Sequence, residues 1–253
     1  MTINRNELQR YLTDLLKPWE VKDFCPNGLQ VEGTDSIRKI ITGVTASEAL
    51  IDKAIEMNAD AILVHHGYFW KGEHQPITGM KKTRIKKLIE NDINLFAYHL
   101  PLDVHPELGN NVQLAKLLDI QNIEGLEQGP GPSIPLKGEF TNPISLDELT
   151  QRIESTLSRK PLVNSGGNFD IKTVAWCTGG GQSYIDLAAQ QGIDCFITGE
   201  ASEQTIHSSN EQRIHFIAAG HHATERYGAK SLGEHLTETF ELDVQFIDIN
   251  NPV

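Results

Sequence analysis

The sequence predicts an α/β fold with mainly parallel sheets, built from two related repeats. Three observations lead to this prediction. Short apolar runs typical of buried strands alternate with stretches of helical pattern, an order that produces parallel strands joined by crossovers. The same order of elements returns in the second half of the chain. A segment rich in Gly and Pro, residues 128–135, lies between the two copies and has the composition of a linker or irregular loop.

Length, charge and cysteine content narrow the class of protein. The 253 residues are 39% hydrophobic, which is enough for one large core or two interlocked ones. The formal net charge of −12 makes duplex DNA an unfavourable partner. No apolar run approaches the ~20 residues of a membrane span. The 3 cysteines include no Cys-x-x-Cys pair, which is typical of a reducing compartment. We therefore expect a cytoplasmic protein without a membrane segment.

The first half predicts an N-terminal helix followed by strands and helices in alternation. Residues 1–20 have the spacing of an amphipathic helix and lack the features of a signal peptide. The run 39–45 (KIITGVT) has the pattern of a buried strand, and a helix over 47–58 follows it with Ser47 as its cap. Further strands are predicted at 59–64 (ADAILV) and 93–98 (INLFAY).

The second half repeats this order. When Asp60 is aligned with Asp194, the first strand, the helix and the second strand match without a gap. We therefore predict a first repeat over residues 1–128 and a second over 129–253. The corresponding elements are predicted as strands at 173–178, 193–198 and 214–219 and a helix at 182–191, preceded by a helix over 144–157 capped near Ser145.

Histidines and carboxylates gather where three of the predicted strands end. In open parallel sheets, binding sites form outside the carboxyl ends of the strands. Half of the 10 histidines in the chain follow strands that end at Val64, Tyr98 and Ala219. The residues concerned are His65, His66, His99, Asp103, His221, His222 and Glu225.

These residue types at these places predict metal binding. His221 and Glu225 are four apart, so on a helix they share a face and can hold one ion. His65 and His66 are neighbours on a strand, so they serve two ions, or they converge where the backbone bends. Asp103 has two oxygens and can bridge a metal pair. Nitrogen and oxygen donors without sulfur favour Zn, Fe, Mn or Ni.

Other patterns leave their alternatives open. Gly179–Gly181 follows a strand, so it is either a phosphate-binding loop or a tight turn near the site. The basic run 81–87 is either a solvated helix face or a contact for an anionic partner. His99 is a candidate for supporting a metal ligand. The remaining histidines are expected to have ordinary structural or surface roles: His74, His105, His207, His215 and His235.

Several longer stretches carry a resemblance to a known family. They are PNGLQVEG (26–33), TGVTAS (42–47), VHHGYFWKG (64–72), HLPLDVHPELGNN (99–111), TGGGQS (178–183), TGEASEQTIH (198–207) and AAGHHATER (218–226). On these stretches the chain resembles the NGG-interacting-factor-like family, also labelled GTP cyclohydrolase I type 2 homologues, and in particular its bacterial YbgI-type members. The resemblance covers essentially the whole chain.

The resemblance implies two intertwined α/β/α repeats and a dinuclear metal centre with two divalent ions per subunit. By position, the implied ligands are His65, His66, Asp103, His221 and Glu225, with Asp103 and Glu225 as candidates for bridging. It also implies a ring-shaped homohexamer. His222 is less well placed as a ligand, and Glu200 and Glu203 are candidates for supporting or substrate-facing groups.

The function that the resemblance implies is metal-dependent hydrolysis of a purine nucleotide, as in a GTP cyclohydrolase, or of a damaged nucleotide. Two alternatives stay open at this point. One is a non-enzymatic metal-binding scaffold that acts through protein partners. The other is a metal-dependent phosphoesterase, which would use the same ions on a different bond.

Overall fold

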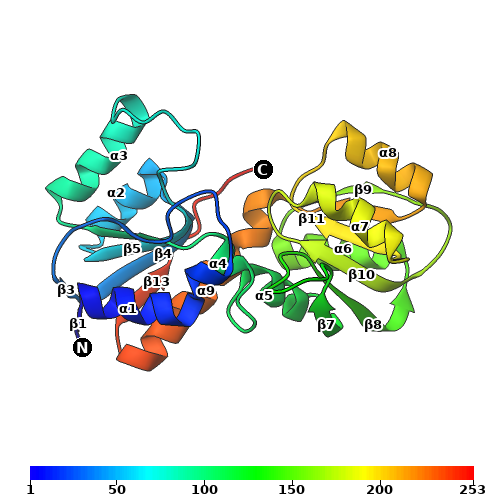
Figure 1. The fold of residues 1–253 in the computed structure, drawn as a ribbon, viewed down its shortest axis with the longest axis horizontal. Helices are drawn as coiled ribbons and strands as arrows, with labels where there is room; N and C mark the ends of the chain where they lie inside the picture. Colours follow the sequence, from blue (N-terminus) through cyan, green and yellow to red (C-terminus); the bar gives the residue numbers. More distant parts are fainter. The chain divides into compact units, whose positions relative to one another are not determined.

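Two separate sheets organise the chain. The computed structural model describes residues 1–253 and divides them into two units. Unit 1 comprises residues 1–108 and 228–250, and unit 2 comprises residues 109–227 and 251–253. Each unit is a sheet with helices on both faces (Figure 1). The predicted repeat boundary near residue 128 lies within unit 2, in the loop between two strands.

Unit 1 contains a five-stranded sheet in the order β13-β4-β5-β6-β2. The strands are β2 (Gly28–Val31), β4 (Lys39–Thr45), β5 (Ala61–His66), β6 (Asn94–Ala97) and β13 (Asp243–Phe246). All neighbours pair in parallel except β2, which pairs antiparallel with β6. The central strands are apolar on both faces, as strands covered on both sides must be. A small antiparallel pair, β1 (Ile3–Asn4) and β3 (Ser36–Ile37), lies beside this sheet.

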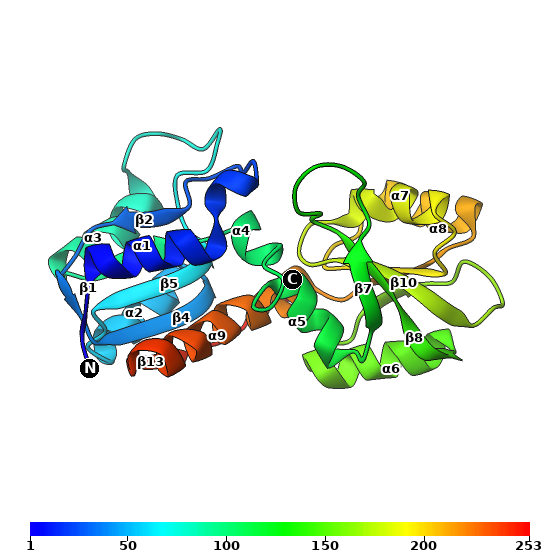
Figure 2. The ribbon, with the colours of Figure 1, turned by 60° about the horizontal axis from the view of Figure 1, so that its bottom comes forward.

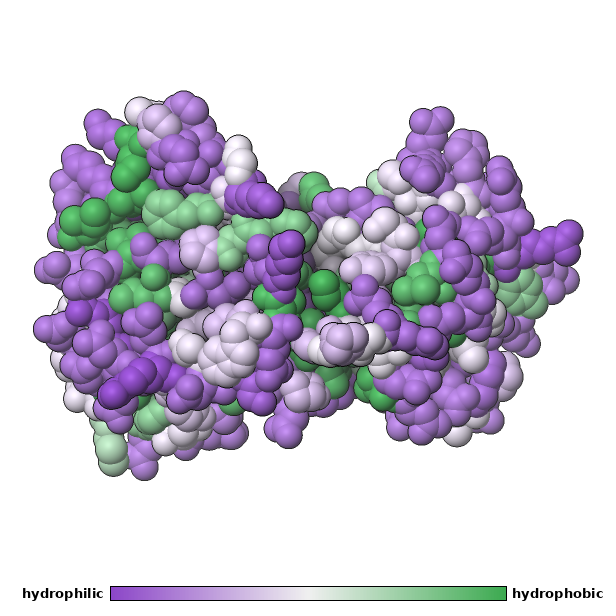
Figure 3. Space-filling model, in the orientation of Figure 1, coloured by the Kyte–Doolittle hydropathy of each residue, from purple (hydrophilic) through white to green (hydrophobic).

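Helices cover both faces of the unit 1 sheet. Apolar side chains of α2 (Glu48–Glu56) and α3 (Gly79–Glu90) form one core with the strands. Those of α1 (Arg5–Leu16) and of the unit 1 part of α9 (His221–Phe240) form the other (Figure 2). In α1, Leu8, Leu12 and Leu16 are buried, whereas the surface over this helix is largely hydrophilic (Figure 3). Two short elements complete the unit: the 3₁₀ turn η1 (Pro18–Glu20) and α4 (Leu100–Asp103).

Unit 2 contains a six-stranded sheet in the order β7-β8-β10-β11-β12-β9. The strands are β7 (Gln121–Gly125), β8 (Leu136–Ile144), β9 (Leu162–Asn164), β10 (Ile171–Cys177), β11 (Cys195–Thr198) and β12 (His215–Ala218). The three central strands, β10, β11 and β12, are parallel, and the flanking strands are antiparallel. One face is covered by α7 (Ile185–Gln190) and α8 (Glu203–Gln212), and the other by α5 (Asn110–Leu117), α6 (Leu146–Leu157) and the start of α9.

The predicted α/β class with parallel strands is confirmed. Ser47 and Ser145 cap α2 and α6 by accepting hydrogen bonds from the amides of Leu50 and Glu148, at 3.3 and 3.1 Å. The antiparallel strands of unit 2 were not predicted. The physical reason lies in their composition: all of β7 is exposed, and β8 carries a glycine and a proline, so neither shows the clean alternation of a strand. No helix is both long and apolar enough to cross a membrane.

Both units fix the start of their first parallel strand with the same hydrogen-bonding device. Asp60, just before β5, accepts hydrogen bonds at Oδ2 from the amides of Arg38 and Lys39, at 2.8 and 2.9 Å. Asp194, just before β11, accepts at Oδ2 from the amides of Lys172 and Thr173, at 3.0 and 2.7 Å. These two carboxylates are the residues that the repeat alignment pairs, so the shared device supports that alignment.

We expect Asp194→Ala to lower the free energy of unfolding by about 2 kcal/mol, because it leaves amide groups at the start of β10 without an acceptor. Urea unfolding followed by circular dichroism measures this change. Asp14→Ala, at an exposed position of α1, is the control and should change the free energy by less than about 0.5 kcal/mol. Equal effects of the two substitutions would contradict the structural role of Asp194.

Candidate metal site

The end of β5 brings two imidazole rings together in unit 1. His65 is fully buried and His66 is partly exposed, as expected for neighbours on a strand. Their ring centroids are nevertheless only 4.5 Å apart. The strand ends at His66, and at the next residue, Gly67, a Cβ atom would lie 2.5 Å from Cβ of Ala97. The packing therefore requires glycine there. The two rings therefore converge at the strand end, and the number of ions that they hold stays a prediction.

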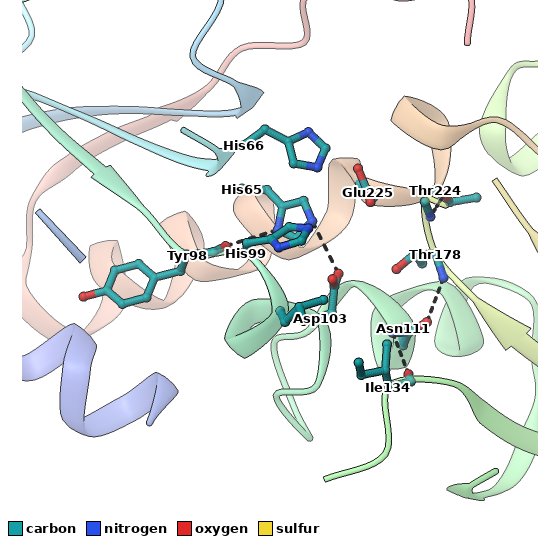
Figure 4. A network of polar contacts seen from close by, with 12 residues as sticks. His65, His66, Tyr98, His99, Asp103, Asn111, Ile134, Thr178, Thr224 and Glu225 are labelled. Atoms are coloured by element: carbon teal, nitrogen blue, oxygen red, sulfur yellow. Dashed lines mark hydrogen bonds and ion pairs between the residues drawn. The ribbon is translucent and has the colours of Figure 1, made fainter. Parts of the chain in front are cut away.

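A backbone carbonyl and a hydroxyl anchor these two rings. Nδ1 of His65 donates to the carbonyl oxygen of Tyr98 at 3.1 Å, and Nδ1 of His66 lies 3.1 Å from Oγ1 of Thr45. Nε2 of His65 lies 3.5 Å from Oδ1 of Asp103, a carboxylate that is only 5% exposed (Figure 4). Unit 1 thus brings together all three of the ligands predicted in its chain segments.

A third imidazole, His99, joins this group from the end of β6. Its ring centroid lies 4.9 Å from that of His65 and 5.6 Å from that of His66. One ring nitrogen from each of the three histidines lies within 4.8 Å of the others. Nδ1 of His99 is 2.7 Å from Oδ1 of Asp23, a side chain that is 5% exposed. His99 thus lies directly beside the predicted ligands His65 and His66.

The Asp23 carboxylate is held as an anion. Burial alone would raise its pKa, but hydrogen bonds and charge from His99, together with hydrogen bonds from Asn27 and the amide of Phe24, hold the pKa below its usual value. Cys25 also lies beside Asp23 and His99. Burial and the charge of Asp23 raise the pKa of the Cys25 thiol to about 12. In the absence of a metal, Cys25 is therefore a neutral thiol.

In unit 2, the second predicted pair lies on the first turns of α9. This helix begins at His221, so His221 and Glu225 share a face as predicted, with Nε2 and Oε2 at 3.2 Å. Nδ1 of His221 lies 2.7 Å from Oε1 of Glu200, and Nε2 of Gln182 donates to Oε2 of Glu200 at 3.3 Å. The His221 ring is thus placed between two carboxylates.

The charge on these carboxylates controls the protonation of His221. Burial alone would lower the pKa of His221, but the hydrogen bonds and charges of Glu225 and Glu200 raise it to about 9. In the absence of a metal, a proton on His221 therefore supplies the positive charge between the two carboxylates. Because a divalent cation can supply the same charge, this arrangement fits a metal site.

The triple-glycine loop packs against this pair and is not shaped as a phosphate cradle. The amide of Gly179 donates to Oγ1 of Thr224 at 2.9 Å, and that of Gly181 donates to Oγ1 of Thr198 at 3.1 Å. A Cβ atom on Gly179 would lie 2.0 Å from Oε1 of Glu225. The structure therefore favours the tight turn near the site. Asn111 holds the preceding strand end by accepting from the amide of Thr178 at 3.0 Å (Figure 4).

Whether these residues fit a divalent ion depends on which nitrogen of each histidine ring already makes a hydrogen bond to the protein. Carbonyl and carboxylate oxygens accept from Nδ1 of His65, His99 and His221, so Nε2 is the nitrogen of each ring that would coordinate an ion. Metal-binding histidines commonly have the other ring nitrogen fixed in this way. The donor chemistry therefore fits a metal of the kind predicted, and several His, Asp and Glu clusters here are able to bind such ions.

The other candidates from the sequence have different roles. Glu203 is 93% exposed at the side chain and lies 3.9 Å from His207, and the described contact of His222 is a backbone hydrogen bond to Val253. Buried His215 bridges the backbone of Gly166 and Phe169. The basic run on α3 is largely paired with acidic side chains, as expected of a solvated face. Its ion pairs join Lys81 to Glu73, Lys86 to Glu90, and Lys87 to Glu48 and Asp52.

Sequence reasoning missed Asp23 and Thr45, and it placed Glu200 only by analogy with the first repeat. Asp23 lies in an irregular segment between η1 and β2, where no periodicity marks it. Thr45 ends a buried strand and has no special spacing to any histidine. The one signal that could have pointed to Thr45 was the parallel pairing of the two predicted strands, because Thr45 lies opposite His66 in the β4–β5 register.

Comparisons with known proteins place the chain in a family. The chain belongs to the Duf34/NIF3 (NGG1p interacting factor 3) family, whose model matches residues 3–252. A Pasteurella multocida protein called GTP cyclohydrolase 1 type 2 homolog is 61% identical over 251 residues, which cover 99% of this chain and 100% of that protein. The Escherichia coli protein of the same name is 55% identical, with the same coverage.

Solved structures agree with this assignment. A structure described as protein ybgI, of unknown function, has a TM-score of 0.95 and 55% identity, and the match covers 99% of this chain and 100% of that one. The structure of TTHA1606 from Thermus thermophilus has a TM-score of 0.89 and 35% identity, with the same coverage. The resemblance to the YbgI-type members is thereby confirmed.

The pKa of His221 predicts how stability depends on pH in metal-free protein. Because its pKa in the folded state, about 9, lies above the ordinary 6.5, protonation of His221 stabilises the folded state. This contribution is complete below pH 6.5 and is lost as the pH rises through about 9. Urea unfolding of chelator-treated protein across this range should show the loss. Glu200→Gln should flatten it, whereas Glu203→Gln should not. The same slope in Glu200→Gln and wild type would contradict the assignment.

Gly179→Ala should weaken metal binding by at least about tenfold, because the new methyl group would displace the buried Glu225 carboxylate. The backbone φ of +65° at Gly179 adds strain for alanine. Isothermal titration with Zn²⁺ measures the affinity. Gly180→Ala is the matched control, because the nearest atom to its Cβ is Oε2 of Glu200 at 3.7 Å. Unchanged affinity in Gly179→Ala would argue against Glu225 as a ligand.

Proposed function

We propose that this protein is a metal-dependent hydrolase with two divalent ions per subunit. The proposed ligands are His65, His66 and Asp103 in unit 1 and His221 and Glu225 in unit 2, and the proposed metals are Zn, Fe, Mn or Ni. The observation that carries the proposal is the anchoring of Nδ1 in His65 and His221, which places Nε2 of each ring beside a buried carboxylate, so that ring and carboxylate would bind the same ion. The further proposal is that all five ligands form one dinuclear centre.

Ions held by these donors would supply Lewis-acid chemistry: they would lower the pKa of water and would polarise a substrate oxygen. The chain's own groups then supply position and charge. The carbonyl of Tyr98 fixes the ring orientation of His65, and Glu200 fixes that of His221. The low exposure of His65, Asp103 and Glu225 limits the water around the donors, which strengthens electrostatic interactions there.

The proposed substrate class is a purine nucleotide, or a damaged form of one. This proposal rests on the relatives named GTP cyclohydrolase 1 type 2 homolog, two of which are 61% and 55% identical to this chain. In a reaction of that kind, water attacks the base ring. We further propose that the protein works in the cytoplasm as a ring-shaped homohexamer, in line with the resemblance drawn from its motifs.

One observation favours a second candidate, a metal-binding scaffold that acts through protein partners. The amides of Gly179 and Gly181 are already bonded within unit 2, so this loop does not offer them to a nucleotide phosphate. A scaffold needs the metals for its shape and has no need of a phosphate cradle.

The decisive experiment counts metals and then looks for turnover. Protein purified without chelator is analysed for metal content, and the metal found is used to assay a nucleotide panel that includes GTP, with ring opening and phosphate release followed separately. We expect near two ions per chain and ring opening. Asp103→Ala should lose at least one ion, because its carboxylate lies beside the His65 donor, whereas His74→Ala, at an exposed position, should keep both.

Each result of this experiment has a distinct meaning. Two ions with phosphate release alone would identify a phosphoesterase. Two ions without turnover would support the scaffold and contradict the hydrolase. No metal, even after reconstitution with each candidate ion, would refute the site. Full occupancy in Asp103→Ala would remove Asp103 from the ligand set.

A further inference from the structure

Hydrogen bonds fix both the backbone and the ring of His99. Asn27 accepts a hydrogen bond from its backbone amide at Oδ1, at 2.7 Å, and Asp23 accepts from the next amide, that of Leu100, at 3.0 Å. These two bonds already tie the irregular segment before β2 to the end of β6. The additional bond from Nδ1 of His99 to Asp23, at 2.7 Å, therefore fixes the ring itself.

The Asp23 carboxylate is itself held in one orientation, because both of its oxygens accept further hydrogen bonds. Oδ1 accepts from the amide of Phe24 at 2.6 Å, and Oδ2 accepts from Nδ2 of Asn27 at 2.9 Å. Together with the bonds to His99 and Leu100, four donors converge on this buried side chain. Rotation of the carboxylate would break several of these bonds at once, so the direction of the His99 ring is fixed as well.

The hydrogen bond to a carboxylate also selects the tautomer of the ring. A carboxylate anion accepts and does not donate, so the proton of a neutral His99 lies on Nδ1 and the lone pair lies on Nε2. The ring is 15% exposed, and one of its nitrogens lies within 4.8 Å of nitrogens of His65 and His66. An oriented imidazole with an open acceptor thus lies beside the proposed metal donors.

We propose that His99 is a catalytic residue of this site: its Nε2 accepts a hydrogen bond from the attacking water and orients it, and Asp23 is the positioning residue that fixes the ring. This inference rests on the proposed hydrolase function. It adds a base-and-carboxylate pair to the five metal ligands, an arrangement in which the carboxylate orients the imidazole that contacts the reacting group.

Two substitutions at position 99 separate this role from a structural one. In His99→Asn, the side-chain amide is able to keep the hydrogen bond to Asp23, but nothing reaches the position of Nε2. In His99→Gln, the side chain reaches that position with a carbonyl acceptor. We expect both variants to keep the wild-type metal content. His99→Asn should lose at least about a hundredfold in turnover of the active nucleotide, and His99→Gln should recover part of this loss.

A readout independent of activity tests the tautomer. Long-range ¹H–¹⁵N correlation spectra of metal-free protein report which ring nitrogen carries the proton. We expect the His99 signals, identified by their absence in His99→Gln, to show a proton on Nδ1 and a bare Nε2. Asp23→Asn should change this tautomer and lower turnover without changing the metal content. A proton on Nε2 of neutral His99 in wild type would overturn the proposal.

The outcomes distinguish this inference from the function on which it rests. Wild-type turnover together with equal turnover in His99→Asn would refute the role of His99 and leave the hydrolase intact. No turnover in wild type would refute the hydrolase and this role with it. Loss of metal in both position 99 variants would make His99 a ligand and would likewise overturn the proposal.

Discussion

The anchoring of Nδ1 is the constraint on which the donor groups of this protein depend. An imidazole has two nitrogens and can present either one, so a ring with both free would sample several orientations and two tautomers. Here the carbonyl of Tyr98 and the carboxylates of Asp23 and Glu200 each accept from an Nδ1. Two of these acceptors are placed by the sheets, because Tyr98 directly follows β6 and Glu200 follows β11. The sheets therefore determine which nitrogen His65 and His221 present.

The positions of the histidine rings consequently depend on strand register as much as on residue identity. Thr45 lies opposite His66 in the parallel β4–β5 pair, and this places its hydroxyl at Nδ1 of that ring. A slip of one residue would exchange the environments of His65 and His66, because alternate side chains point to opposite faces. Core packing opposes such a slip, because it would move Ile41 and Leu63 each into the core on the opposite face of the sheet, where other side chains are already closely packed. Core packing therefore maintains the donor geometry.

Much of this arrangement could be predicted from the sequence because it follows from backbone rules. The carboxyl ends of parallel strands were identified by their apolar runs, and these located His65, His66, His99 and His221. Helical spacing paired His221 with Glu225. The supporting groups obey no such rule. Asp23 acts from an irregular segment and reaches a residue far along the chain, so only the folded structure shows the contact. The convergence of the His65 and His66 rings is likewise visible only in the folded structure, because neighbours on a strand are expected to point to opposite faces.

The repeated scaffold also accounts for the chemical difference between the two donor groups. Glu200 follows Asp194 at the same interval as His66 follows Asp60, and Gly199 takes the place of His65. A Cβ atom at Gly199 would lie 2.6 Å from Cα of His221, so the start of α9 excludes a side chain there. Unit 2 is thereby left with carboxylates around one imidazole, whereas unit 1 offers three imidazoles. Asp60 and Asp194 fix the strand starts of both units in the same way, whereas the residues at the strand ends differ. The same fold therefore carries mainly neutral imidazoles in unit 1 and mainly anionic carboxylates in unit 2.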